Sequence, residues 1–239
     1  MHVPKASVSA MIDAVIFDLD GTLVDSVPGI EYAAAAAWAA VQPGPPCPPL
    51  RSLIGPPIRE IFHQVLPGAD SATLTALEGA FRNIYDLDGW KKTVAYPDVP
   101  ETLASLTASG VQCFGVTNKP GLPTQRILEQ CGLKAYFRAF LSPDSRKPPF
   151  ASKAEAVASL LTEHGLDPAR TLFMGDSVDD ALAARACGLS FAAVRSGYGH
   201  AHLQIDHHIT YTLNTCADLL CIASIEAYVK NNQKHLSTP

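Results

Sequence analysis

The residues best suited to chemistry in this 239-residue chain are two aspartates that follow a short apolar run. Asp18 and Asp20 come directly after residues 14–17, and Gly21 is next. Residues two apart in extended backbone share a face, and the glycine permits a turn that brings both carboxyls to one point. One carboxylate could attack phosphorus while the other hands a proton to the leaving oxygen. The alternative interpretation is an ordinary Asp-Gly turn in which Asp18 caps the next element.

Acidic residues gather again farther along the chain. Asp176, Asp179 and Asp180 follow an apolar run at residues 171–174. Helix capping by Asp176 or Ser177 explains one or two of these acids, but not three so close together. Carboxylates gathered in one site bind a hard cation, and Mg²⁺ takes protein oxygens and substrate phosphates together. These acids are therefore candidate metal ligands.

A third polar pair, Thr117-Asn118, follows the apolar run at residues 111–116. A hydroxyl and the following backbone N–H can bind phosphate oxygens, although helix capping is the simpler interpretation for this pair alone. A cation is also needed to offset the gathered acids and a phosphate. Lys147 and Lys153 are the candidates that precede the last acidic cluster.

These candidate residues lie far apart in the chain, so strands and helices must bring them together. The sequence predicts such elements. Apolar runs that read as strands alternate with helical patterns. The predicted strands are residues 14–17, 111–116, 139–141, 171–174 and 191–194. The predicted helices between them are residues 99–109, 122–131, 153–164 and 179–187. This alternation predicts a doubly wound, mostly parallel α/β sheet, Rossmann-like, with the polar residues at its carboxyl edge.

Residues 26–96 interrupt the alternation with helical patterns at 32–41, 58–65 and 71–85. A proline-dense stretch at residues 43–49 is unsuited to helix or central strand and reads as a stiff connector. We interpret the whole stretch as an inserted α-helical cap domain. The predicted division is a core of residues 11–25 and 97–225, a cap of residues 26–96, and terminal extensions of residues 1–10 and 226–239.

Composition narrows the class of protein. With 47% hydrophobic and 17% charged residues, the chain reads as an ordinary globular protein. Its net charge of -5 argues against a nucleic-acid-binding face, and no apolar run approaches the ~20 residues of a membrane span. The six cysteines form no CxxC pair, which favours a reduced, cytoplasmic protein. We expect a monomer or homodimer.

In their order along the chain, these motifs resemble the haloacid dehalogenase-like hydrolase superfamily. The motifs that carry the resemblance are residues 18–24, residues 117–118, a lysine, and residues 175–180. The resemblance covers residues 13–194, and the helical insertion is similar to the cap of the phosphoglycolate phosphatase-like branch.

The resemblance implies a phosphatase. Asp18 would form an aspartyl-phosphate, and Asp20 would protonate the leaving group and later activate water. Thr117 and Asn118 would hold the phosphoryl oxygens, next to the turn at Gly21. A halide leaving group needs no proton donor, so Asp20 favours a phosphatase or phosphomutase over a dehalogenase.

The resemblance also implies a Mg²⁺ site. Asp18, the backbone carbonyl of Asp20 and Asp176 would bind the ion, and Asp180 would orient its surroundings. From the cap, residues 55–59 are predicted to face the core as a loop and helix start. Arg59 there could meet an anionic leaving group, although an exposed helical arginine is an equally good interpretation.

The choice of lysine depends on spacing. Many relatives have Lys-Pro-x-Pro before the helix that precedes the last acidic motif, and Lys147 matches that pattern. Lys153, however, begins the predicted helix at 153–164, so the helix would anchor it. A cation at a helix N-terminus disfavours the helix by about 0.3–1 kcal/mol, which hints at a compensating negative partner. We therefore favour Lys153.

The sequence leaves three alternatives open. The substrate is a small-molecule phosphate ester: phosphoglycolate by family likeness, with nucleotide monophosphates or pyrophosphate nearly as plausible. A sugar phosphomutase would use the same motifs. A non-catalytic binding or regulatory module on this fold is weakened because every expected catalytic residue type is present.

Overall fold

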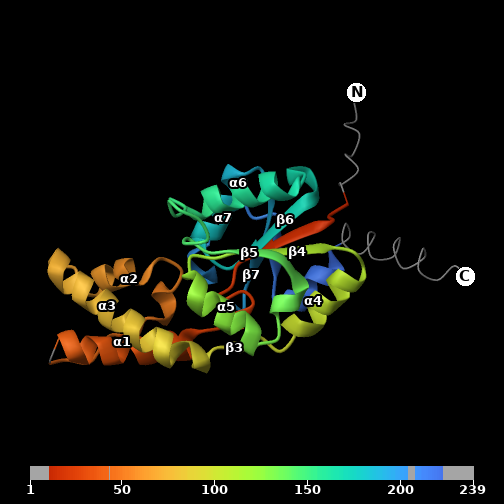
Figure 1. The fold of residues 1–239 in the computed structure, drawn as a ribbon. Helices are drawn as coiled ribbons and strands as arrows, with labels where there is room; N and C mark the ends of the chain where they lie inside the picture. The colour runs from red at the N-terminus through yellow and green to blue at the C-terminus, as the bar shows by residue number, and fades with distance from the viewer. Residues whose placement is uncertain (1–10, 43, 204–207, 223–239) are drawn as a thin grey trace, which may run out of the picture.

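A six-stranded parallel sheet forms the centre of the molecule in the computed structural model (Figure 1). The structure describes residues 11–42, 44–203 and 208–222, so the predicted extensions at 1–10 and 226–239 lie outside the described residues. The strand order is β5-β4-β1-β6-β7-β8. The strands are β1 (Ala14–Phe17), β4 (Gln112–Val116), β5 (Phe137–Leu141), β6 (Thr171–Gly175), β7 (Ser190–Val194) and β8 (Tyr211–Leu213).

The strand β1 lies between β4 and β6 and is buried on both faces. Phe17, its last residue, is in register with Gly115 of β4 and Met174 of β6. A parallel strand covered on both faces reads as a continuous apolar run, which is what residues 14–17 show. The carboxyl ends of three neighbouring strands therefore meet at one edge of the sheet.

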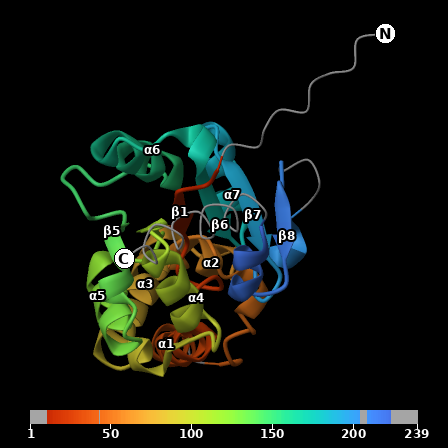
Figure 2. The same cartoon turned by 90° about the vertical axis from the view of Figure 1, so that its right-hand side faces the viewer.

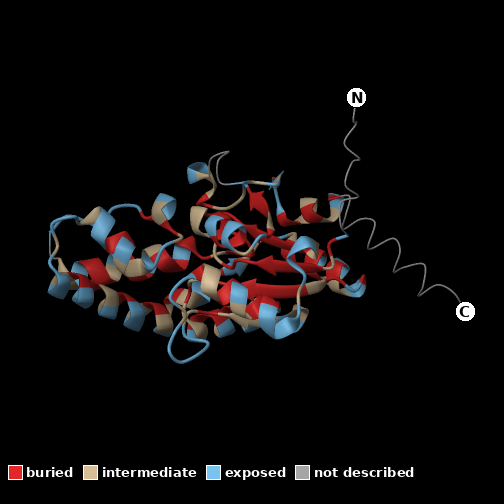
Figure 3. Cartoon of the chain, turned by 90° about the horizontal axis from the view of Figure 1, so that it is seen from above, coloured by how far each residue is buried: buried red, intermediate tan, exposed pale blue. Residues whose placement is uncertain are grey.

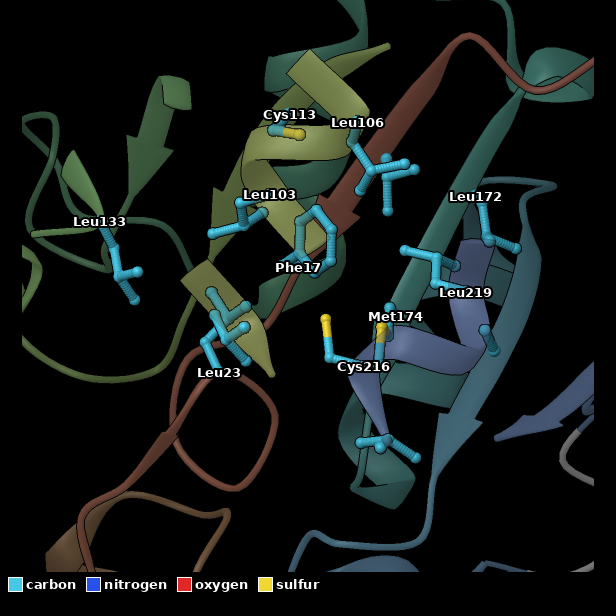
Figure 4. Close-up of a cluster of buried hydrophobic side chains, with 14 of the residues drawn as sticks. Phe17, Leu23, Leu103, Leu106, Cys113, Leu133, Leu172, Met174, Cys216 and Leu219 are labelled. Carbon is cyan, nitrogen blue, oxygen red and sulfur yellow. The ribbon is translucent and has the colours of Figure 1, made fainter. Parts of the chain in front are cut away.

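Helices cover both faces of this sheet (Figure 2). Helices α4 (Val99–Ala108) and α5 (Gly121–Gln130) contribute to one hydrophobic cluster, into which Val15 and Phe17 of β1 point. Figure 4 shows Phe17 within this cluster, beside leucines of α4. Helices α6 (Lys153–His164) and α7 (Val178–Ala186) form the second cluster with the alternate β1 residues. The sheet is thus doubly wound, as the sequence predicted.

The cap lies to one side of the sheet and has its own core (Figures 1 and 3). Its helices are α1 (Val27–Val41), α2 (Ile58–Val65) and α3 (Ser71–Leu87). The chain leaves the core through β2 (Val24–Asp25) and returns through β3 (Val94–Ala95), and these two short strands pair antiparallel. Buried aromatic and aliphatic side chains, Trp38, Phe62 and Leu77 among them, hold the three helices together.

The sequence placed most elements within a few residues of their observed bounds, but two differences have physical reasons. Helix α1 begins at Val27 rather than residue 32, because Pro28 is tolerated in a first helical turn. Gly29 lies in the same turn, and a Cβ there would collide with the carbonyl oxygen of Gly89. The strand β8 was missed because its three residues at the edge of the sheet form no apolar run. In the described part of the chain, no helix is both long and apolar enough to span a membrane.

Candidate active site

Three of the predicted polar residues lie together at the carboxyl edge of the sheet. Asp18 follows β1, Thr117 follows β4 and Asp176 follows β6, with β1 between the other two. The backbone N–H of Asp18 donates to the carbonyl of Met174 over 3.0 Å, which fixes the start of this loop against β6. In doubly wound sheets such an edge is where ligands bind.

Lys153 connects two of the buried acids. Its Nζ lies 3.0 Å from Oδ1 of Asp18 and 2.6 Å from Oδ1 of Asp180. Burial opposes the charge on Lys153, but the two carboxylates outweigh it and hold the lysine pKa above its usual value. Lys147, by contrast, is exposed in the preceding loop. The structure thus brings Lys153, and not Lys147, to the acids.

The side chain of Asp180 is occupied by hydrogen bonds within the protein. Its Oδ2 accepts from the backbone N–H groups of Asp176 and Ser177 at 3.2 and 3.0 Å, and from Oγ of Ser177 at 2.7 Å. Ser177 in turn caps helix α7, so the two residues form a capping box. Because Oδ1 of Asp180 also pairs with Lys153, this side chain fixes the positions of Lys153, Asp176 and Ser177.

Glycines allow the surrounding loops to close on Asp176. Gly21 has φ +83°, and a Cβ at Gly21 or at Gly197 would overlap the Asp176 carboxylate. The N–H of Gly199 donates to Oδ2 of Asp176 over 2.8 Å, and the hydroxyl of Thr22 donates to Oδ1 over 3.3 Å. Gly21 therefore allows the close approach of its loop to Asp176, whereas the sequence predicted a turn that brings Asp18 and Asp20 together and a substrate-binding role for Gly21.

The acids at this edge fit a divalent cation. Carboxylate oxygens of Asp18, Asp176 and Asp180 lie within 4.8 Å of one another. Burial raises the pKa of Asp18 well above its usual value, and burial together with the Asp180 charge raises the pKa of Asp176 to about 7. Three carboxylates and the one lysine among them leave two negative charges, which a Mg²⁺ ion would balance with its preferred oxygen ligands.

The second aspartate of the first motif makes a separate ion pair that sequence reasoning missed. Nζ of Lys119 lies 2.8 and 2.7 Å from the two carboxylate oxygens of Asp20. Lys119 is buried, and the ring of Tyr85 from the cap helix α3 lies 4.9 Å from the same ammonium group. Burial opposes the charge on Lys119, but Asp20 and Tyr85 raise its pKa above the usual value. The sequence feature that could have identified Lys119 is its position directly after Thr117-Asn118, at the end of a predicted strand.

Lys119 is expected to act as a positioning residue for Asp20. Replacing it with methionine keeps the bulk of the side chain but removes the charge that holds the carboxylate. We expect Lys119→Met to lower kcat on an alkyl phosphate by roughly 10²-fold, the scale of general acid catalysis. The loss should be much smaller on 4-nitrophenyl phosphate, whose leaving group needs little protonation.

The matched control is Lys134→Met, because Lys134 pairs with Glu129 on the exposed surface. Kinetics on both substrates with both variants make the measurement. An equal loss on the two substrates would indicate a structural role for Lys119 and would contradict the positioning role.

Thr117 and Asn118 lie where the sequence placed them, but they have protein partners. Oγ1 of Thr117 accepts from the N–H of Lys119 over 3.1 Å, so its own proton is available for a phosphoryl oxygen. The Asn118 amide donates to Oδ2 of Asp179 over 2.7 Å and to the carbonyl of Gly55 over 3.4 Å. Asn118 therefore also connects the core loop to the cap.

A pocket of about 370 Å³ lies between the core and the cap. Asp18, Asp20 and Lys153 line its core side, and residues 54–58 line it from the cap, where the sequence predicted residues 55–59. Arg59 is not among the lining residues of this pocket in the described chain. Its guanidinium bonds instead to Ser71 and Thr75 within the cap, because the second residue of helix α2 points toward helix α3. The structure gives no support to the predicted substrate contact of Arg59.

Comparison with known proteins agrees with this geometry. The family model described as "Haloacid dehalogenase-like hydrolase" matches residues 15–194. "Phosphoglycolate phosphatase 1" of Pseudomonas aeruginosa is 33% identical over 223 residues, which cover 90% of this chain and 81% of that protein. "Phosphoglycolate phosphatase" of Vibrio vulnificus is 31% identical over 224 residues, with 90% and 98% coverage.

Solved structures show the same likeness. A predicted phosphoglycolate phosphatase from Haemophilus somnus superposes with a TM-score of 0.78 at 26% identity, covering 88% of this chain and 97% of that one. A haloacid dehalogenase-like family protein from Streptococcus pneumoniae, at 24% identity and a TM-score of 0.79, covers the same shares and shares the fold. The chain therefore belongs to the haloacid dehalogenase-like hydrolase family, in its phosphoglycolate phosphatase-like branch, and is a phosphoric monoester hydrolase, as the sequence predicted.

Proposed function

We propose that this chain is a Mg²⁺-dependent phosphatase that removes the phosphoryl group of a small phosphomonoester through an aspartyl-phosphate on Asp18. The observation that carries the proposal is the buried set of Asp18, Lys153, Asp176 and Asp180, of which Asp18 and Lys153 line the pocket. The relatives' name makes phosphoglycolate the first substrate to test. Asp18, Asp176 and the backbone carbonyl of Asp20 would hold the ion, which would supply positive charge to the phosphoryl oxygens when bound.

In the first step, a carboxylate oxygen of Asp18 attacks phosphorus as the bond from phosphorus to the leaving oxygen breaks. Asp20, the partner of Lys119, must take up a proton before this step, and it then donates that proton to the leaving oxygen, so the product leaves as a neutral alcohol. Lys119 fixes the position of Asp20 on the pocket wall while this happens. Lys153 is held by its hydrogen bond to Asp180, and its second hydrogen bond keeps Asp18 oriented toward the pocket.

In the second step, water replaces the alcohol and attacks the same phosphorus. Asp20 takes the proton of that water, the bond from phosphorus to Asp18 breaks, and inorganic phosphate leaves. Throughout both steps the phosphoryl oxygens need donors, and the hydroxyl of Thr117 and the backbone N–H of Asn118 are the groups that we propose for this role. The cap excludes bulk water while it covers the pocket. The chemistry is thus positioning together with charge neutralisation.

The test is a phosphate-release assay on a panel of small phosphomonoesters, with Mg²⁺ and with excess chelator. The proposal expects inorganic phosphate only when Mg²⁺ is present. Hexose 1-phosphates belong in the panel, because a phosphomutase would return an isomer instead of inorganic phosphate. If no phosphomonoester is turned over in any condition, the proposal fails and a binding or regulatory role takes its place.

The Mg²⁺ requirement should depend more on Asp176 than on Asp180. Asp176→Ala removes a proposed ligand, so we expect the Mg²⁺ concentration for half-maximal activity to rise about tenfold or more. Asp180→Ala should raise it less, because both oxygens of Asp180 already bond within the protein. Titration of both variants with Mg²⁺ makes the comparison. Equal effects of the two substitutions would contradict the assignment of Asp176 as a Mg²⁺ ligand and of Asp180 as an orienting residue.

We further infer a cytoplasmic location and binding to neither nucleic acid nor membrane. All six cysteines are free thiols in the structure, which supports a reducing compartment. The net charge of -5 supports the absence of a nucleic-acid face. We also infer a monomer or homodimer, which size-exclusion chromatography with light scattering tests.

A further inference from the structure

We propose that this enzyme prefers phosphomonoesters of uncharged, apolar alcohols to phosphoglycolate. The inference rests on the proposed phosphatase function and concerns the part of the pocket that receives the leaving group. That part is formed by the cap, and the surface that the pocket offers is predominantly apolar. Its aliphatic and aromatic lining includes Ile30, Ile54, Ile58, Ile61, Phe81 and Tyr85.

Charge argues against an anionic leaving group. Three cationic side chains line the pocket in the described part of the chain: Arg82, Lys119 and Lys153. The two lysines hold the carboxylates of Asp18, Asp20 and Asp180. Arg82 is turned to Glu78, with Nη2 and Nε 2.8 and 3.2 Å from the same carboxylate oxygen.

Two further acidic residues on the pocket wall disfavour the binding of an anionic leaving group. Asp86 of helix α3 and Asp144 of the loop after β5 add negative charge to the lining. The carboxylate of a bound glycolate moiety would therefore lose water without gaining a cation of its own. An unpaired charge taken out of water is strongly disfavoured, whereas an alkyl group gains from the same environment.

Size points the same way. The volume of about 370 Å³ lies within the range of roughly 300–1000 Å³ that is typical of small-molecule sites. Once the phosphoryl group is placed on Asp18, a glycolate moiety would leave much of the apolar wall without a contact. A branched or ring-bearing alcohol would contact half-buried Ile58 and the small parts of Ile61 and Phe81 that are exposed at the pocket wall.

The experiment compares kcat/KM for phosphoglycolate, ethyl phosphate and benzyl phosphate with Mg²⁺ present. Ethyl phosphate matches phosphoglycolate in its carbon count but lacks the carboxylate. We expect ethyl phosphate to exceed phosphoglycolate, and benzyl phosphate to exceed ethyl phosphate by about tenfold or more, the scale of apolar discrimination in a pocket. A higher kcat/KM for phosphoglycolate than for both other esters would overturn the inference. Failure to hydrolyse any of the three, or 4-nitrophenyl phosphate, would instead overturn the proposed function.

Three variants sharpen the result. Ile58 is half-buried at the start of helix α2, so Ile58→Lys places a cation on the cap wall. It should raise the ratio of phosphoglycolate to benzyl phosphate activity about tenfold, whereas Ile58→Met should leave the order of the three substrates unchanged.

Arg82→Ala should also leave the order of the three substrates unchanged. Selective loss of phosphoglycolate activity in Arg82→Ala would show that Arg82 leaves Glu78 to bind the carboxylate, which contradicts the inference.

Discussion

Asp18→Asn is expected to reduce turnover by roughly 10³-fold or more, because an amide cannot act as the nucleophile that forms the phosphoryl-enzyme bond. The substitution keeps the size of the side chain and an oxygen that can accept the 3.0 Å bond from Lys153. Steady-state phosphate release by the purified variant measures the loss. More than a few per cent of wild-type activity, in a preparation free of wild-type enzyme, would remove Asp18 from its proposed role.

The same variant should remain folded. Burial raises the pKa of Asp18, which means that the protein interior disfavours its charged form in the absence of a cation. Loss of that charge should leave the melting temperature of the Mg²⁺-free protein close to that of wild type, or higher. Asp13→Asn is a matched control from the other end of the same strand, where Asp13 pairs with Arg170 at 2.7 Å near the surface. It should keep its activity.

Lys153→Ala is expected to inactivate the enzyme, whereas Lys147→Ala should behave like wild type. Lys153 is buried and bonded to Asp18 and Asp180, so its removal leaves two buried carboxylates without a cation. Removal of one partner from a buried ion pair costs about 3–5 kcal/mol, so we also expect a lower melting temperature. Lys147 is exposed, and its removal should change neither quantity.

Because Lys153→Ala combines lost charge with lost stability, Lys153→Met is the sharper variant. It keeps the length of the side chain inside the site. Activity and melting temperature are measured for all three variants at saturating Mg²⁺. An inactive Lys147→Ala enzyme beside a nearly normal Lys153→Met enzyme would reverse the assignment.

The sequence was sufficient to predict the sheet and its helices, since an apolar run closed by a polar strand end is a local signal. Residues 14–17 are such a run, and all four are buried in β1. Helix α6 was predicted with both of its observed bounds, because Ser152 caps its start and Gly165, at φ +61°, ends it. These features depend on neighbours in the chain.

Two side-chain contacts depended on tertiary structure: nothing in the sequence pointed to the first, and the second was left open. Lys119 reaches Asp20 across 99 positions of sequence, and no local pattern distinguishes it from an exposed lysine in a loop. Arg59 had the right charge and lay in the right segment, but the direction of its side chain follows from the contact between helices α2 and α3.

The sequence by itself therefore determined the fold class and the family, and it identified the candidate acids of the site. It could do so because apolar runs and motif spacing are local features, set by residues that are close together in the chain. Only the tertiary structure decided which cations pair with which acids and what faces the leaving group. Lys153 pairs with Asp18 and Asp180, Lys119 pairs with Asp20, and Ile61 and Phe81 of the cap line the same pocket as these lysines. Those relations depend on distances between segments far apart in the chain, which are fixed when the cap and core pack around one pocket.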